Sequence, residues 1–335
     1  MSPNPKPRTF EDKPAVLTAV PLWVGIYGAT GSGKTWSALR LATGMQRVTG
    51  GEIFMIDTEA RRGLHYAKHF TFRHVEFAAP FSPLDYLAAV EHCVSKGARI
   101  IVIDSMSHEH EGPGGVLEWQ AAEQARLAKL WNTSEDKAKM SAWQAPKTAR
   151  RRMINTLLQL PINLVFCFRA KEKLKIIPGR SPEPLGFMPI AGEELAYEMT
   201  ATALLLPGAN GVPTWASKEL GENVMIKRPE QFRALIREQG EKPLNEDMGE
   251  AMARWAKGEA PAAAPAQSAY ERLWFAIENA NAGQIDALAE GCKAALAAKQ
   301  VTRGEAKNLS DAIAARREAL AGVVSPDAEP PAGAP

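Results

Sequence analysis

Residues 28–35 of this chain have the composition and spacing of a loop that binds phosphate groups. They read Gly-Ala-Thr-Gly-Ser-Gly-Lys-Thr and fit the P-loop pattern G-x-x-x-x-G-K-[ST] without a mismatch. Glycines at these positions let the backbone fold around a phosphate, with successive N–H groups directed inward. The pattern predicts that Lys34 reaches the β- and γ-phosphates of a nucleotide and that Thr35 binds Mg²⁺.

The segments on both sides of this loop predict the strand and the helix that such a site needs. Residues 22–27 form a short apolar run typical of a buried strand, and residues 35–42 have apolar side chains at helical spacing. The helix N-terminus adds unpaired N–H groups and the positive end of its dipole. The residues expected to contact the nucleotide are Gly28, Ala29, Thr30, Gly31, Ser32, Gly33, Lys34, Thr35 and Trp36.

A second apolar run ends in a carboxylate, as in the Walker B arrangement. It spans residues 99–105, reads Arg-Ile-Ile-Val-Ile-Asp-Ser, and places Asp104 at the carboxyl end of a predicted central strand. This end of a parallel sheet faces the mouth of the phosphate loop. We therefore expect Asp104 to hold Mg²⁺ together with Thr35.

The carboxylate that activates water is expected elsewhere, because Ser105 follows Asp104 where many AAA-type ATPases carry a glutamate. The strand after the phosphate loop ends Asp-Thr-Glu at residues 57–59, and its carboxyl end is expected to open onto the same crevice. Glu59 is thus the expected general base, and a solvated acid of the loop is the alternative interpretation. The other candidates for the base are Glu109 and Glu111.

These motifs and their order resemble the RecA-type ATPase core. RecA proteins carry a strand that ends Asp-Ala-Glu and a Walker B strand that ends Asp-Ser, to which residues 57–59 and 104–105 correspond. After Walker B come a glycine-bearing segment at 106–115, a helix, and a strand that ends at Arg169. RecA proteins have a glutamine that senses the γ-phosphate at this last position. This chain departs from that pattern with Arg169, and we expect an arginine at this position to act in catalysis by direct contact with phosphate.

Over about residues 20–230 the chain is similar to bacteriophage AAA family ATPases, including RecA-like single-strand annealing proteins. This resemblance implies an α/β core with a mainly parallel sheet flanked by helices, and ATP with Mg²⁺ as cofactors. It also implies single-stranded DNA as a partner and assembly into a homo-oligomer, either a ring or a filament. In such assemblies a basic residue of one subunit, here Lys171 or Lys173, completes the neighbouring site.

Basic residues suited to single-stranded DNA gather in two segments. The predicted loop at 170–190 carries Lys171, Lys173, Lys175 and Arg180 together with Phe187. The predicted helix around 147–152 carries Lys147, Arg150, Arg151 and Arg152. Cations beside an aromatic ring suit contact with the backbone and stacking on bases. A solvated charged face is the alternative interpretation of both segments.

The cysteines and histidines do not have the spacing of a structural metal site. Cys93, Cys167 and Cys292 are far apart and odd in number, which favours buried thiols in a reducing compartment. His108 and His110 have no third ligand nearby in the sequence, so they are interpreted as polar residues of a loop.

Composition allows one large α/β domain and a smaller unit within the 335 residues. The net charge of +2 gives no global attraction to nucleic acid, so any basic surface has to be local. No apolar run reaches the length that spans a membrane. The run at 15–27 leads into the phosphate loop and not to a cleavage site, so a cytoplasmic location is expected, in the bacterial host if the chain is phage-encoded.

Strand-like and helix-like segments alternate from about residue 20 to 230, which predicts a mainly parallel sheet covered by helices. Further strands are expected at Ile53–Asp57, His74–Phe77, Ile100–Asp104, Ile162–Phe168 and Thr202–Leu206, and helices at 83–96, 116–131 and 139–160. The expected organisation is a flexible arm at 1–19, a RecA-like ATPase core at 20–256, an Ala/Pro-rich linker at 257–268, a small helical domain at 269–321 and a disordered tail at 322–335. The helical domain is expected to recruit a protein partner or to pack on the core.

The expected function is ATP binding and hydrolysis coupled to single-stranded DNA, in recombination or annealing of the phage type. A helicase-loader-like nucleotide switch and a small-molecule kinase are the alternatives. A kinase needs an acceptor pocket and usually an arginine-rich lid over the phosphates. The proline-bearing segment 170–190 fits such a lid poorly.

Overall fold

The chain divides into two compact units, Met1–Pro261 and Ala262–Pro335. The computed structural model describes residues 11–12, 14–15, 20–175, 183–214, 232, 235–236, 242–259, 269–278, 280–281 and 283–321. The predicted arm, linker and tail lie mostly or wholly outside these residues.

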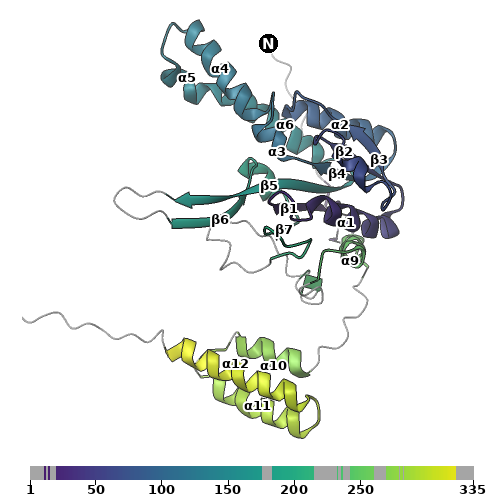
Figure 1. Ribbon diagram of the computed structural model, residues 1–335, viewed down its shortest axis with the longest axis vertical. Helices are drawn as coiled ribbons and strands as arrows, with labels where there is room; N and C mark the ends of the chain where they lie inside the picture. Colours follow the sequence, from purple (N-terminus) through teal and green to yellow (C-terminus); the bar gives the residue numbers. More distant parts are fainter. Residues whose placement is uncertain are drawn as a thin grey trace, which may run out of the picture. The chain divides into compact units, whose positions relative to one another are not determined.

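The apolar runs of the sequence form a sheet in the first unit. In the described part of the chain its seven strands are β1 (Trp23–Gly28), β2 (Glu52–Asp57), β3 (Arg73–Glu76), β4 (Ala98–Asp104), β5 (Asn163–Lys175), β6 (Glu183–Pro189) and β7 (Ala201–Leu205). The order is β3-β2-β4-β5-β1-β7, with parallel neighbours throughout, and β6 pairs antiparallel with the outer part of β5 (Figure 1).

The register of these strands brings the predicted site residues to one edge. Gly28 at the end of β1 pairs with Arg169 on β5, and Asp57 at the end of β2 pairs with Asp104 at the end of β4. Strand β5 lies between β1 and β4, so the phosphate loop and the Walker B carboxylate flank one central strand. Site residues from four separate segments therefore meet at the carboxyl edge of the sheet.

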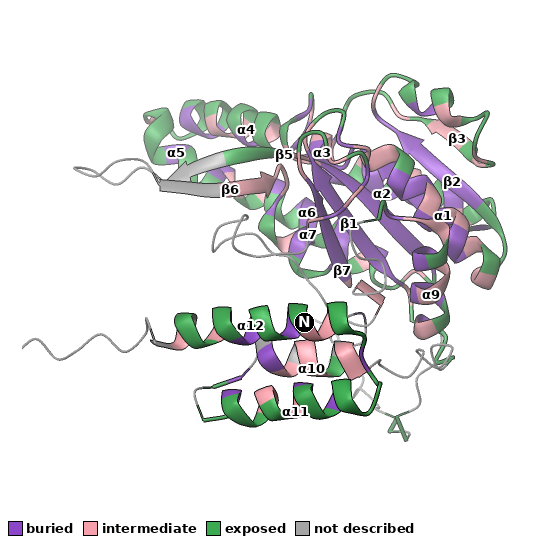
Figure 2. Cartoon of the chain, turned by 60° about the horizontal axis from the view of Figure 1, so that its bottom comes forward, coloured by how far each residue is buried: buried purple, intermediate pink, exposed green. Residues whose placement is uncertain are grey.

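Helices cover both faces of the sheet. Alternate residues of the central strands pack on α1 (Lys34–Thr49) and α9 (Glu246–Ala256) on one side, and on α2 (Pro83–Ser95) and α6 (Gln144–Leu157) on the other. The central strands β1, β4 and β7 and the inner part of β5 are consequently buried and largely apolar, as expected for a parallel sheet that is covered on both sides (Figure 2 shows the burial). No described helix combines the length and the apolar character needed to cross a membrane.

Close packing of α9 on α1 fixes the helix that begins at the phosphate loop. A Cβ atom at Gly44 would lie 1.8 Å from the Glu246 carbonyl oxygen, and one at Gly249 would lie 2.2 Å from the Leu41 carbonyl oxygen. Glycine is therefore required at both positions. An ion pair between Arg40 and Glu246, at 2.6 Å, joins the same two helices.

The predicted fold class is confirmed, and three local predictions are wrong. Residues 139–160 are not one helix, because Trp143 separates α5 (Glu135–Ala142) from α6. His108 and His110, expected in a loop, lie in a short helix, α3 (Ser107–Glu111). The predicted loop at 170–190 is largely a two-stranded ribbon, because β5 continues to Lys175 and pairs with β6. The strand was not predicted because this part of β5 is polar, and only the part of β5 inside the main sheet has the apolar residues typical of a strand.

The second unit consists, in its described residues, of α10 (Ala269–Glu278), α11 (Ile285–Ala297) and α12 (Arg303–Ala321). These helices enclose a small core that includes Ile277, Ile285, Leu309 and Ile313. The apolar positions at helical spacing in this segment thus pack against one another within the unit. The three cysteines of the chain, in both units, are buried free thiols.

Candidate nucleotide-binding site

The phosphate loop connects β1 to α1 and requires glycine at its sharpest bend. Gly33 immediately precedes α1 and has a φ of 94°, in the left-handed region that favours glycine. A Cβ atom there would also lie 2.7 Å from the Gly211 nitrogen. The Lys34 ammonium donates to the Ala29 carbonyl oxygen at 2.8 Å and so spans its own loop. The lysine is thereby held at the mouth of the loop, where phosphate groups would bind.

Thr35 and Asp104 form a pair of oxygen donors beside this lysine. The Thr35 hydroxyl donates to an Asp104 carboxylate oxygen at 2.5 Å, although 69 residues separate them in sequence. Burial raises the pKa of Asp104 to about 6, while the Thr35 hydroxyl and the Lys34 charge act in the opposite direction. A hydroxyl and a carboxylate are hard oxygen ligands of the kind that Mg²⁺ prefers. The donor set therefore fits the predicted metal.

Glu59 lies across the pocket from these residues, on the loop that follows β2. Its carboxylate is only 18% exposed and accepts from the Arg169 guanidinium at 2.7 Å. The His108 ring, which also contacts the Thr58 hydroxyl at 2.8 Å, lies 3.9 Å away. The predicted base and the predicted phosphate-contacting arginine are thus ion-paired with each other.

The loop that carries Glu59 is held by a buried carboxylate that no sequence pattern distinguishes from other acids. Asp57 accepts from the backbone N–H groups of Glu59 at 2.7 Å and Gly63 at 2.8 Å. His74 on β3 contacts the same carboxylate at 2.9 Å. These bonds tie both ends of the 57–63 loop to one side chain, so Asp57 positions Glu59 through the backbone.

One pocket of about 180 Å³ joins these groups. Its lining contains seven residues of the predicted site, namely Thr30, Gly31, Lys34, Thr35, Glu59, Asp104 and Arg169, and four others, namely Arg62, Gly63, Tyr66 and Ser105. Arg62 is not predictable from the sequence although it lies 3.6 Å from Glu59, because only the fold of the 57–63 loop turns it toward the pocket. Trp36 does not line this pocket and instead packs edge-to-face on Phe70 and His69.

The two alternative bases do not line the pocket. Glu109 is buried and forms a bidentate ion pair with Arg150 of α6, with distances of 2.8 and 2.9 Å. Burial raises the pKa of the Glu109 carboxyl, and Arg150 opposes this shift. Glu111 is exposed at the end of α3. Arg150, one of the four cations of the predicted helical DNA segment, is only 4% exposed and has a structural role.

We expect Glu109→Gln to lower the free energy of unfolding by about 3 kcal/mol, the lower end of the range for breaking a buried ion pair, because the buried Arg150 charge then has only Glu194, at 3.6 Å, as a counter-ion. Urea unfolding followed by circular dichroism measures the change. Glu111→Gln, at an exposed site in the same short helix, is the control and should stay within about 0.5 kcal/mol of the parent protein. Equal stability of the two variants would contradict the structural role of the pair.

The predicted DNA-binding segment is described only in part. Lys171 is exposed on the β5–β6 ribbon, whereas Phe187 is half-buried against the core and is not free to stack on a base. The side chains of Lys173 and Lys175, and Arg180 altogether, lie outside the described residues. His108 contacts Thr58 and His110 contacts Arg150, and no group of three metal-ligating side chains occurs among the described residues.

Comparison with known proteins identifies the core. One solved structure with similarity is that of a KaiC-like protein from the hyperthermophilic archaeon Pyrococcus horikoshii, at 16% identity and a TM-score of 0.29, covering 57% of this chain and 80% of that chain. No curated protein matches the chain. Residues 21–203, more than half of the chain and all of the residues that form the pocket, match the AAA domain family. The protein therefore belongs to the AAA domain family, and its first unit is an α/β core with a P-loop at the carboxyl edge of a mainly parallel sheet.

Proposed function

We propose that this protein hydrolyses ATP and couples hydrolysis to single-stranded DNA, in recombination or annealing of the phage type. The observation that carries the hydrolytic part is the convergence of Lys34, Thr35, Asp104 and Glu59 on one pocket. The first three suffice to bind a nucleotide. Glu59 adds a carboxylate that can accept a proton from the attacking water, which distinguishes a hydrolase from a binding protein.

In this proposal each side chain has one task. Thr35 and Asp104 hold Mg²⁺, which when bound neutralises charge on the β- and γ-phosphates. Lys34 leaves the Ala29 carbonyl and contacts the phosphates as a point charge. Glu59 orients water for attack in line with the leaving group and takes its proton.

We expect the Arg169 side chain to respond to whether the bound nucleotide carries a γ-phosphate. Its side chain is paired with Glu59, and its backbone N–H donates to the Ser107 hydroxyl at 2.9 Å. A γ-phosphate would attract the guanidinium away from Glu59 and so release the base. Because β5 continues from Arg169 into the ribbon that carries Lys171, this movement would reach a basic segment directly.

The proposal includes assembly into a homo-oligomer in which Lys171 of one copy reaches the site of its neighbour, and a protein partner for α10–α12. Two other functions use the same pocket. A nucleotide switch of the helicase-loader type would bind ATP with little turnover, and a small-molecule kinase would transfer the phosphoryl group to an acceptor other than water.

ATP turnover with and without DNA tests the proposal. We expect single-stranded DNA to increase the rate of phosphate release and duplex DNA of equal length to do so less. Fast turnover that no DNA affects would contradict the coupling, and slow turnover under all conditions would favour the switch. ADP formation without phosphate release, in the presence of an acceptor, would identify a kinase.

A further inference from the structure

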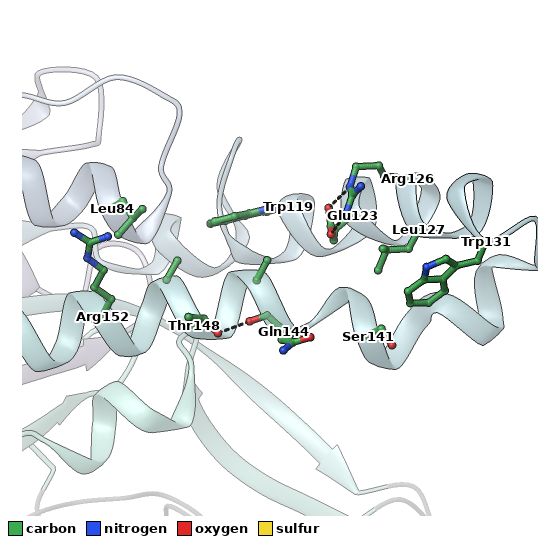
Figure 3. Close-up of a pocket in the computed structure, with 12 residues that line it drawn as sticks. Leu84, Trp119, Glu123, Arg126, Leu127, Trp131, Ser141, Gln144, Thr148 and Arg152 are labelled. Atoms are coloured by element: carbon green, nitrogen blue, oxygen red, sulfur yellow. Dashed lines mark hydrogen bonds and ion pairs between the residues drawn. The ribbon is translucent and has the colours of Figure 1, made fainter. Parts of the chain in front are cut away.

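A long groove lies outside the nucleotide pocket, between α4 (Val116–Leu130) and the pair α5 and α6. Its volume is about 660 Å³, larger than that of the nucleotide pocket. Figure 3 shows Leu84 and Arg152 at one end, Trp131 at the other, and Trp119 between them. Helices α4 and α5 extend away from the sheet in both views of the chain (Figures 1 and 2), so the groove follows a projecting arm.

Two tryptophan side chains face this groove, one from α4 and one from the residue that follows it. Trp131 is 48% exposed, a large fraction for so apolar a side chain, and Trp119 is half-buried. They are 12 residues apart, which corresponds to about 18 Å along a helix axis at 1.5 Å per residue. That distance spans several nucleotides of a single strand, and tryptophan rings that line an open groove suit stacking on bases.

The helices that form the groove, α4 to α6, also concentrate positive charge. Residues 116–157 contain eight Lys and Arg against four Asp and Glu, whereas the whole chain has a net charge of only +2. Five of these cations are exposed and form no ion pair or hydrogen bond with a described residue, namely Lys129, Lys137, Lys139, Arg151 and Arg152. Of the acids, Glu123 is already neutralised by Arg126 at 2.7 Å. The unpaired positive charge on α4 to α6 therefore suits binding of a polyanion.

We propose that this groove binds single-stranded nucleic acid, with bases stacked on Trp119 and Trp131 and phosphates near Arg152. The inference rests on the proposed function and assigns the DNA contact to a surface other than the β5–β6 ribbon. A rigid duplex could not present unstacked bases to two separate rings. An acidic peptide would satisfy the charges, but it would not use two separate flat rings along an open groove.

The groove is also connected to the nucleotide pocket through buried contacts. Arg150 lies on α6 two residues before Arg152, and its ion pair with Glu109 joins α6 to α3. The first residue of α3, Ser107, accepts the backbone N–H of Arg169. A nucleic acid strand in the groove would thus contact a helix that is joined to the pocket by one ion pair and one hydrogen bond.

Binding of a fluorescein-labelled oligo(dT) of about 20 nucleotides to the full chain tests the inference by anisotropy. We expect Trp131→Ala to weaken binding about 5- to 150-fold, the range for loss of one stacked base. Arg152→Glu should weaken it and lower the slope of log K against log salt by about 0.7 for each phosphate that Arg152 neutralises. Lys96→Glu is the charge-matched control, at an exposed lysine at the opposite end of α2 from Leu84.

Basal ATP turnover and thermal unfolding of each variant should match those of the parent protein. Oligonucleotide binding by both groove variants that equals binding by Lys96→Glu would overturn the inference while leaving the proposed function intact. A parent protein that neither binds the oligonucleotide nor responds to it in ATP turnover would overturn both. Quenching of tryptophan fluorescence by an oligoglutamate peptide, without oligonucleotide binding, would overturn it in favour of a protein ligand.

Discussion

Replacing Glu59 by glutamine is expected to slow ATP hydrolysis by about 10²- to 10⁴-fold while nucleotide binding is retained. The amide has nearly the shape of the carboxylate and can still accept a hydrogen bond from Arg169, but it cannot take a proton from water. The loss should therefore fall on kcat and leave KM nearly unchanged. Single-turnover phosphate release and binding of a fluorescent ATP analogue measure the two quantities separately.

Glu111→Gln is the matched control for Glu59→Gln. Both remove one negative charge close to the carboxyl edge of the sheet, but Glu111 is exposed and does not line the pocket. We expect this variant to turn over ATP like the parent protein. Normal hydrolysis by Glu59→Gln together with an inactive Glu111→Gln would show that the base was assigned to the wrong carboxylate.

The residues of the phosphate loop could be predicted because their chemistry is local. A strand, a glycine-rich turn and a helix follow one another within about 20 residues, and each has its own sequence signal. The positions of Asp104 and Glu59 followed from a rule of parallel sheets, in which strand ends meet at one edge. The structure places Asp104 opposite Asp57 in the register, as that rule requires.

The contacts that support these residues could not be predicted from the sequence. The bond between Asp57 and His74 and the ion pair between Glu109 and Arg150 join residues 17 and 41 positions apart, in different elements. Charge alone made Arg150 equivalent to its neighbours Arg151 and Arg152, although only Arg150 faces the interior. Burial of a charged side chain depends on a counter-ion that only the fold supplies.

The length of β5 also could not be predicted from the sequence. Its inner half is apolar because helices cover both faces, and its outer half carries Lys171 and Glu172 because solvent reaches the ribbon. Backbone pairing with β6 maintains the strand beyond Arg169 without an apolar signal. As a result, the residue expected to contact phosphate lies inside a continuous strand and not at the start of a loop.

Lys34→Ala is expected to abolish ATP turnover, a loss of at least about 10³-fold. The ammonium is the one cation that the phosphate loop itself supplies, and it is already held at the loop by the Ala29 carbonyl. Removing it leaves the β- and γ-phosphates without their principal point charge in both the ground state and the transition state. Nucleotide affinity should therefore fall together with kcat, unlike the result expected for Glu59→Gln.

Two substitutions make the Lys34 experiment specific. Lys96→Ala removes an exposed lysine away from the pocket and should leave turnover unchanged. Lys34→Arg keeps the charge but replaces a compact ammonium, which contacts the Ala29 carbonyl at 2.8 Å, by a larger planar guanidinium that places its charge differently. We expect Lys34→Arg to be impaired as well, since the site depends on the position of the charge and not only on its sign. Turnover by Lys34→Ala at the rate of the parent protein would show that the 28–35 loop is not where ATP is hydrolysed.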